Sequence, residues 1–146
     1  FIGASANPFA DPAKIQVPRL AKKVAAGAEF IQTQCVFNIE KFKEWMNGVR
    51  ERGLDTATHI LAGITPARSA AMLEYMATRV AGMDVPEAVI ARVKGVPKAR
   101  QAEEGIRIAV ETIRQLREIP GVGGVHIMAI EWEESVPEIV KGAGLR

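Results

Sequence analysis

The chain has 146 residues, of which 48% are hydrophobic and 25% are charged, as in an average globular protein. Lysine and arginine number 19 against 17 aspartates and glutamates, and the two signs are interspersed along the chain. With 5% aromatic residues and no basic cluster, neither nucleic acid nor an anionic membrane is an expected partner. No apolar run approaches the roughly 20 residues that span a bilayer, so we predict a cytoplasmic protein.

Strand-like and helix-like segments alternate along the whole chain. Turn signals at Asn7-Pro8 and Asp11-Pro12 end the first strand, Gly27 ends the first helix, and Asn38 is a predicted N-cap. The glycine cluster 121–124 is predicted to be a turn that precedes the last strand. The predicted strands cover residues 1–5, 30–37, 58–64 and 125–130, and the predicted helices cover 18–26, 39–52, 68–79, 86–94, 97–118 and 136–141.

This alternation predicts parallel βαβ units, and the apolar strands predict a sheet that is covered on both faces. A doubly wound sheet and part of a barrel both fit the pattern. An open sheet would leave the strand at Phe1 on a bare edge, whereas half of a (β/α)8 barrel of roughly 250 residues fits the chain length. Because residue 1 is not methionine and residues 1–5 are typical of the end of a buried strand with no preceding turn, we predict that residues 1–146 are a single domain cut from a larger fold.

The single cysteine and the two histidines are expected to be structural. Cys35 excludes an intrachain disulfide, and no histidine is predicted beside it, so we expect a small buried residue rather than a nucleophile. His59 and His126 fall near the starts of predicted strands, away from the end where ligands bind in a barrel, and we expect both to pack in the core. No metal site is predicted.

Polar residues gather where the predicted strands end. Gln32 and Gln34 share one face of the second strand by alternation, with Thr33 on the other face. Two amides on the inner face could bind the edge of a heterocycle that both donates and accepts hydrogen bonds, such as a pterin or a flavin. In the alternative interpretation, Gln32 lies deeper and bonds to neighbouring strands, since buried amides must find partners.

Acidic residues follow the last predicted strand, and a basic pair lies on the first predicted helix. Glu131 and its neighbours Glu133 and Glu134 could supply a general acid or simply form the solvated first turn of a helix. Lys22 and Lys23 could bind phosphate or simply be solvated helix lysines. The residue patterns leave both alternatives open.

Several segments resemble methylenetetrahydrofolate reductases. Residues 27–38 (GAEFIQTQCVFN) resemble a strand of that family that carries a Thr-Gln pair. Residues 3–8 (GASANP) are similar to its fifth-strand loop, 62–66 (AGITP) to its seventh and 124–130 to its eighth, in the same order. The resemblance therefore implies an α/β fold that is the C-terminal half, strands 5 to 8 with their helices, of a (β/α)8 TIM barrel, with the N-terminal half missing.

The resemblance also implies an activity and a cofactor. Members of the family reduce 5,10-methylenetetrahydrofolate to 5-methyltetrahydrofolate by hydride transfer from a reduced flavin, either FAD or FMN. By position, Gln34 matches the glutamine that contacts the folate pterin, with Gln32 and Glu131 as further substrate-binding candidates. Asn7 lies in the loop facing the flavin, and Lys23 matches a basic flavin contact. The family's general acid belongs to the first half, so we expect no catalytic residue here and an inactive fragment.

The chain departs from the family pattern at two places. Where the family has a second substrate-contacting glutamine, this chain has Met72. The arginine that the family carries after its eighth strand aligns near Trp132. Residues 82–107 and 131–134 are closer to reductases of anaerobes that use the acetyl-coenzyme A route. That likeness implies an iron-sulfur or zinc partner subunit, and we also expect an oligomer. The alternatives are another TIM-barrel enzyme, or a non-catalytic half-barrel that assembles with a partner chain.

Overall fold

The computed structural model describes residues 1–145, and within them four strands form one parallel sheet in the order β1-β2-β3-β4. The strands are β1 (Gly3–Ala6), β2 (Phe30–Cys35), β3 (His59–Ile64) and β4 (Val122–Ile127). The α-helices are α1 (Gln16–Ala25), α2 (Ile39–Glu51), α3 (Leu54–Ala57), α4 (Ala70–Arg79), α5 (Glu87–Lys94), α6 (Gln101–Arg117) and α7 (Val136–Ala143). Short 3-10 turns η1 (Ala13–Ile15), η2 (Lys98–Arg100) and η3 (Glu133–Ser135) precede α1, α6 and α7. The predicted α/β alternation with a parallel sheet is confirmed.

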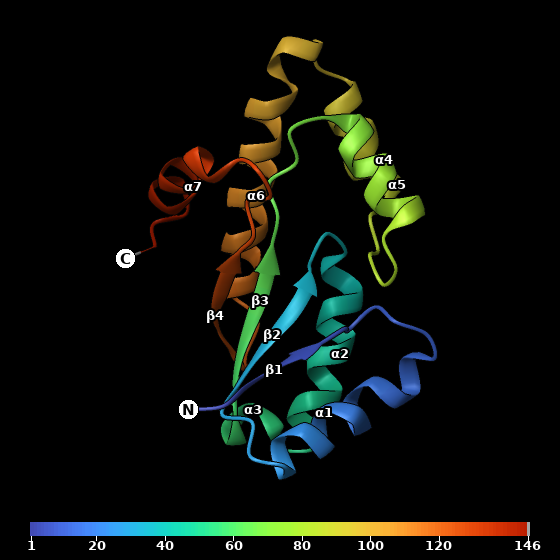
Figure 1. The fold of residues 1–146 in the computed structure, drawn as a ribbon, viewed down its shortest axis with the longest axis vertical. Helices are drawn as coiled ribbons and strands as arrows, with labels where there is room; N and C mark the ends of the chain where they lie inside the picture. Colours follow the sequence, from blue (N-terminus) through green and yellow to red (C-terminus); the bar gives the residue numbers. More distant parts are fainter. Residues whose placement is uncertain (146) are drawn as a thin grey trace.

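Helices cover one face of this sheet. Figure 1 shows α2 and α6 behind the strands, and the strands contribute fully buried apolar residues such as Ile31 and Ile60 to that side. Phe42 and Met46 of α2 and Ile113 of α6 complete the same core. Burial of these side chains, each worth roughly 1.5–3 kcal/mol, holds the helices on the sheet.

The opposite face of the sheet carries exposed polar residues. Ser5 on β1 and Gln32 on β2 are register partners and are both exposed. The prediction that both faces are covered is therefore wrong for residues 1–145. The physical reason is the alternation of side chains along a strand, which sends Ile31 into the helix-covered core and the neighbouring Gln32 to the open face.

Side chains cap the N-termini of two helices in the middle of the chain. The Asn38 side chain accepts a hydrogen bond from the Lys41 backbone nitrogen at 3.1 Å, which caps α2 as predicted. Ser69 caps α4 in the same way through Met72 at 3.2 Å, so α4 begins two residues later than the predicted start at Arg68. The two predicted helices in series are α5 and α6. In residues 1–145 no helix is long and apolar enough to cross a membrane.

The predictions for β4 and for both histidines are wrong. Only Gly121, with a φ of 88°, takes a turn conformation, and Gly123 and Gly124 already belong to the strand. Because β4 therefore begins three residues before the predicted start at residue 125, His126 lies near its carboxyl end and is half-buried. His59 begins β3 on the open face and is exposed rather than packed in the core.

A second apolar cluster joins α4, α5 and α6 beyond the carboxyl end of β3. Leu73 of α4, Val93 of α5 and Ile108 of α6 pack against Ala67 of the loop between β3 and α4. Gly105 lets α6 approach this loop, because a Cβ at that position would lie 1.8 Å from the Ala67 carbonyl oxygen. The cluster fixes the loop that leaves the carboxyl end of β3.

We expect Gly105→Ala to lower the free energy of unfolding of the full-length protein by about 2 kcal/mol, because backbone rather than a flexible side chain opposes the added methyl group. Denaturant titration measures this change. Gly95→Ala is the matched control, since Gly95 has a helical φ of −69° and its nearest neighbours would lie 3.4 Å from the new Cβ. Equal stability of Gly105→Ala and the wild type would contradict the close approach.

The Cys35 thiol is 1% exposed, and its Sγ lies 2.8 Å from Thr65 Oγ1. Burial raises the pKa of this thiol above its ordinary value of 9.0. The structure thus agrees with the expectation of a small buried residue.

We expect Cys35 to react with thiol reagents at pH 8 much more slowly in the native protein than in urea. Because the folded pKa is raised, the associated stability is present in full below pH 9.0 and is lost as the pH rises through the folded value. The free energy of unfolding should therefore fall more steeply above pH 9.0 in the wild type than in Cys35→Ala. Parallel pH profiles for the two proteins would refute this linkage.

Candidate functional site

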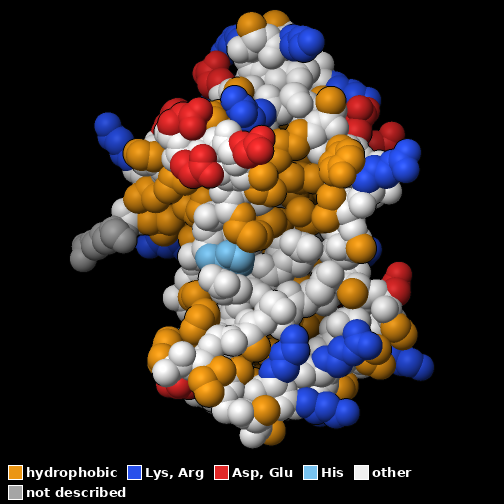
Figure 2. All heavy atoms as spheres, in the orientation of Figure 1, with side chains coloured by type: hydrophobic (Ala, Val, Ile, Leu, Met, Phe, Trp, Pro, Cys, Tyr) orange, Lys and Arg blue, Asp and Glu red, His pale blue; other side chains and the backbone are white. Residues whose placement is uncertain are grey.

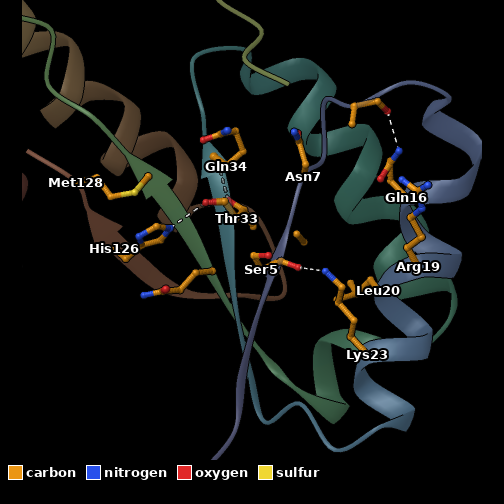
Figure 3. A pocket seen from close by; sticks show the side chains of 13 residues that line it. Ser5, Asn7, Gln16, Arg19, Leu20, Lys23, Thr33, Gln34, His126 and Met128 are labelled. Atoms are coloured by element: carbon orange, nitrogen blue, oxygen red, sulfur yellow. Dashed lines mark hydrogen bonds between the residues drawn. The ribbon is translucent and has the colours of Figure 1, made fainter. Parts of the chain in front are cut away.

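An open cavity of about 440 Å³ lies over the open face of the sheet, between α1 and the carboxyl ends of β1, β2 and β4. Figure 3 shows residues of α1 on one side of it and His126 and Met128 on the other. Four of the five residues singled out from the sequence line this cavity, namely Asn7, Lys23, Gln32 and Gln34. The remaining lining residues are Ser5, Ala6, Ala10, Gln16, Arg19, Leu20, Thr33, His126 and Met128.

The α1 side of the cavity is positively charged. Arg19 and Lys23 lie one helical turn apart on α1, and no described residue that lines the cavity is acidic. Figure 2 shows basic side chains gathered over this part of the surface. Lys23 Nζ donates a hydrogen bond to the Ser5 carbonyl oxygen, which ties the helix to the end of β1. This side of the cavity suits an anionic ligand group.

The loop between β1 and α1 is held by part-buried hydrogen bonds. Gln16 is 6% exposed, and its Nε2 donates to the carbonyl oxygens of Ala10 at 3.0 Å and Pro12 at 3.2 Å. Asn7 Oδ1 accepts from the Phe9 backbone nitrogen at 3.0 Å, which fixes the turn at the end of β1. These contacts hold the cavity wall in place without using Arg19.

A bulge in β2 shapes the other side of the cavity. Between the pairs Gln32↔Leu61 and Cys35↔Gly63, β2 contributes two residues and β3 one. The Gly63 backbone nitrogen donates to the Thr33 hydroxyl at 3.0 Å, and the same hydroxyl donates to the Gln34 carbonyl oxygen at 2.9 Å. A side-chain oxygen thus takes the place of a backbone acceptor where the bulge interrupts the regular ladder.

Gln34 has a defined orientation at this bulge. Its Oε1 accepts a hydrogen bond from the Cys35 backbone nitrogen at 3.0 Å. The amide nitrogen makes no hydrogen bond to the described residues and is the end that remains to donate to a ligand. Gln32, exposed one step earlier on the same face, adds a second amide, so the interpretation that it is buried between strands does not hold.

Sequence reasoning missed His126 as a cavity residue. Its Nε2 lies 2.9 Å from the Thr33 carbonyl oxygen, and the ring lines the cavity. The available signal was the pair Gly123-Gly124, which is compatible with a strand packed closely on its neighbour. A strand beginning at Val122 would have moved His126 to the ligand-binding end.

Glu131 does not join the other four predicted residues. It lies in the exposed loop after β4, with a φ of 52°, and is not among the residues that line the cavity. Its carbonyl oxygen accepts from Arg68 Nη1 at 3.2 Å, and the Arg68 guanidinium stacks 5.6 Å from the ring centre of Trp132. Glu133 and Glu134 form the turn η3 that leads into α7, as the structural interpretation predicted.

Asn7 also borders a second hollow on the far side of its loop. The segment between α4 and α5 lies against it there, because a Cβ at Gly82 would lie 1.8 Å from Asn7 Nδ2. Asp84 of that segment accepts from Asn38 at 3.2 Å and pairs with Lys41, and these partners hold the pKa of its carboxyl below the usual range. No group of three metal-ligating side chains occurs among residues 1–145.

Comparison with known proteins identifies relatives of the whole described region. Methylenetetrahydrofolate reductase 2 of Schizosaccharomyces pombe is 32% identical over 141 residues, and the probable methylenetetrahydrofolate reductase (NADPH) of Caenorhabditis elegans is 25% identical over 150 residues. The matches cover 92% and 99% of this chain but 22% of each relative, so the chain spans about a fifth of their length.

A solved structure shares the fold. It is described as an uncharacterized protein from Clostridium thermocellum that binds two copies of 5-methyl-5,6,7,8-tetrahydrofolic acid. The two chains superpose with a TM-score of 0.64 at 18% identity, over 97% of this chain and 51% of that one. The family model for methylenetetrahydrofolate reductase matches residues 4–144, nearly the full length. The chain belongs to the methylenetetrahydrofolate reductase family.

Proposed function

We propose that this chain forms part of the active site of an enzyme that reduces 5,10-methylenetetrahydrofolate to 5-methyltetrahydrofolate with a flavin cofactor. The observation that carries the proposal is the cavity in which the free amide nitrogen of Gln34 lies opposite the basic side chains of Arg19 and Lys23. One side supplies neutral hydrogen-bond donors for a heterocycle, and the other supplies positive charge for a phosphate. Family membership over residues 4–144 supports this combination of ligands.

We further propose that residues 1–146 are one unit, strands 5 to 8 of a (β/α)8 barrel. Two features support this: the sheet has an open polar face, and β1 and β4 each pair with one strand only among the described residues. In a barrel such a face lines the interior, and both edges pair with further strands. The missing strands would bring the general acid, so the chain alone is expected to be inactive.

The basic side of the cavity fits a flavin nucleotide, FAD or FMN. Arg19 and Lys23 would bind its phosphate through charge-assisted hydrogen bonds, and Asn7 would contact it from the end of β1. When bound, the flavin supplies the hydride that the folate receives. The protein's contribution here is to hold the two ring systems together and to keep water out, which lowers the entropic barrier to transfer.

The β2 side of the cavity fits the pterin of folate. A pterin edge offers both acceptors and donors, and Gln34 has its nitrogen free while its oxygen is engaged by the Cys35 backbone. Gln34 would therefore donate to the pterin, and Gln32 would contact it from the next inward position of the strand. Glu131 and Arg68 lie in the loops beyond β4 and β3, where a more distant part of folate would pass.

The resemblance of residues 82–107, which include α5 and the start of α6, to reductases of acetyl-coenzyme A route anaerobes supports an iron-sulfur or zinc partner subunit. The free, buried thiol of Cys35 is consistent with the proposed location of the protein in the reducing cytoplasm. Purification of the native enzyme with its co-eluting subunits, followed by metal analysis, tests the partner proposal. A homogeneous, metal-free oligomer of this chain's own full-length protein would reject it.

The full-length protein should carry a yellow flavin spectrum, and anaerobic addition of reductant should bleach it. Adding 5,10-methylenetetrahydrofolate should then restore the oxidised spectrum as 5-methyltetrahydrofolate forms. A correctly folded protein without flavin, or a reduced flavin that folate leaves unchanged, would reject the proposed function.

In the full-length enzyme, we expect Gln34→Ala to weaken binding of 5-methyltetrahydrofolate about tenfold, the equivalent of about 1.4 kcal/mol, because one hydrogen-bond donor to the pterin is lost. Flavin content should remain that of the wild type. Fluorescence titration of the folate and the visible spectrum measure the two quantities separately. Unchanged folate affinity would show that Gln34 does not bind the pterin.

Lys23→Met should have the opposite pattern, with a raised dissociation constant for the flavin and a smaller change in folate affinity. The expected loss is about tenfold, in the range of a charge-assisted hydrogen bond, and it should shrink as salt is added. Lys98→Met, at an exposed lysine that does not line the cavity, is the control. Fluorescence titration of the apoenzyme with flavin measures this constant, and a wild-type flavin dissociation constant in Lys23→Met would refute the assignment.

A further inference from the structure

The bulge in β2 exposes a backbone carbonyl group to the cavity. The Gly63 backbone nitrogen donates its hydrogen bond to the Thr33 hydroxyl. The Thr33 carbonyl oxygen therefore does not accept a hydrogen bond from Gly63. This oxygen lies above Gly63, since a Cβ there would come within 2.6 Å of it. The peptide group between Thr33 and Gln34 therefore faces the open side of the sheet, directly before the Gln34 side chain that is proposed to bind the pterin.

His126 reaches this carbonyl group from two strands away. Gly63 and His126 are register partners on β3 and β4, and the imidazole spans the glycine to bring Nε2 within 2.9 Å of the Thr33 oxygen. Figure 3 shows this contact between the two strands. Because a carbonyl oxygen only accepts hydrogen bonds, Nε2 carries the proton and donates it. Any side chain at position 63 would block this path.

We propose that His126 is a positioning residue that holds Gln34 in its ligand-reading orientation through the Thr33 carbonyl group; this inference rests on the proposed function. Three hydrogen bonds fix the segment. His126 Nε2 donates to the Thr33 carbonyl oxygen, the Thr33 hydroxyl donates to the Gln34 carbonyl oxygen, and the Cys35 backbone nitrogen donates to Gln34 Oε1. The first of these is the one that comes from outside β2 and its immediate neighbour β3. Without it, only contacts within β2 and with β3 hold the peptide group, so the Gln34 amide is oriented less firmly.

The test uses the full-length flavoenzyme and five variants, one of which is the single Gln34→Ala protein described above. His126→Leu removes the donor and keeps an apolar side chain of comparable reach, whereas His126→Gln restores an N–H at the distance of Nε2. His59→Leu is the matched control, because His59 is exposed at the opposite end of the sheet and does not line the cavity. The fourth variant combines His126→Leu with Gln34→Ala. Each protein is assayed for flavin content, thermal midpoint and dissociation constant for 5-methyltetrahydrofolate.

His126→Leu is expected to raise the folate dissociation constant about fivefold, the loss of one neutral hydrogen bond, with flavin content unchanged. His126→Gln should return to within about twofold of the wild type, and His59→Leu should equal it. The double variant should bind folate as weakly as Gln34→Ala alone, because His126 acts through Gln34. A general loss of structure would not produce this rescue and non-additivity.

Unchanged folate affinity in His126→Leu, or a further fivefold loss in the double variant, would overturn the inference and leave the proposed function standing. If His126→Leu does not fold, His126→Asn replaces it, since its shorter amide does not reach the Thr33 oxygen; wild-type affinity in that variant has the same meaning. A wild-type enzyme that binds no folate would overturn the proposed function itself, and the role of His126 with it.

Discussion

The hydrogen bond from the Gly63 backbone nitrogen to the Thr33 hydroxyl is the contact on which the cavity depends. In a regular parallel ladder this nitrogen would bond to a backbone carbonyl of β2. Because the hydroxyl takes that role, β2 accommodates one extra residue, and the Thr33 carbonyl group turns to the open face, where His126 contacts it. Glycine at position 63 is the necessary partner, since a side chain there would collide with the Thr33 and Gln34 backbone.

Two kinds of side chain line the cavity, and they come from different structural elements. Arg19 and Lys23 project from a helix, where long basic side chains adapt to a charged group whose position varies. The amides of Gln32 and Gln34 both project from β2, an inner strand of the sheet, where backbone hydrogen bonds to β1 and β3 limit movement. A rigid wall suits a planar heterocycle whose reacting atom must be placed to within a fraction of an ångström, and a flexible wall suits a phosphate.

Patterns of single residues in the sequence were enough to find much of this arrangement, and contacts between strands were not. The alternation of elements, the Asn38 cap and the placement of Gln32 and Gln34 on one side of β2 follow from local rules, and the structure agrees with each. The bulge in β2 depends on which residue of β3 faces Thr33, which is a matter of register. His126 was misassigned for a related reason, because Gly123 and Gly124 resemble a turn until a neighbouring strand supplies their hydrogen bonds.

The division of the sheet into an apolar face covered by helices and an open polar face explains how exposed polar residues are tolerated. Ile31 and Ile60 are fully buried against the helices and supply apolar burial that does not depend on the side chains of the other face. Ser5 and Gln32, exposed on that other face, incur no desolvation cost in residues 1–145 and remain available for a ligand. Once further strands or ligands enclose this face, each amide must find a partner. A folate and a flavin would provide such partners, so ligand binding and enclosure of the polar face would favour each other.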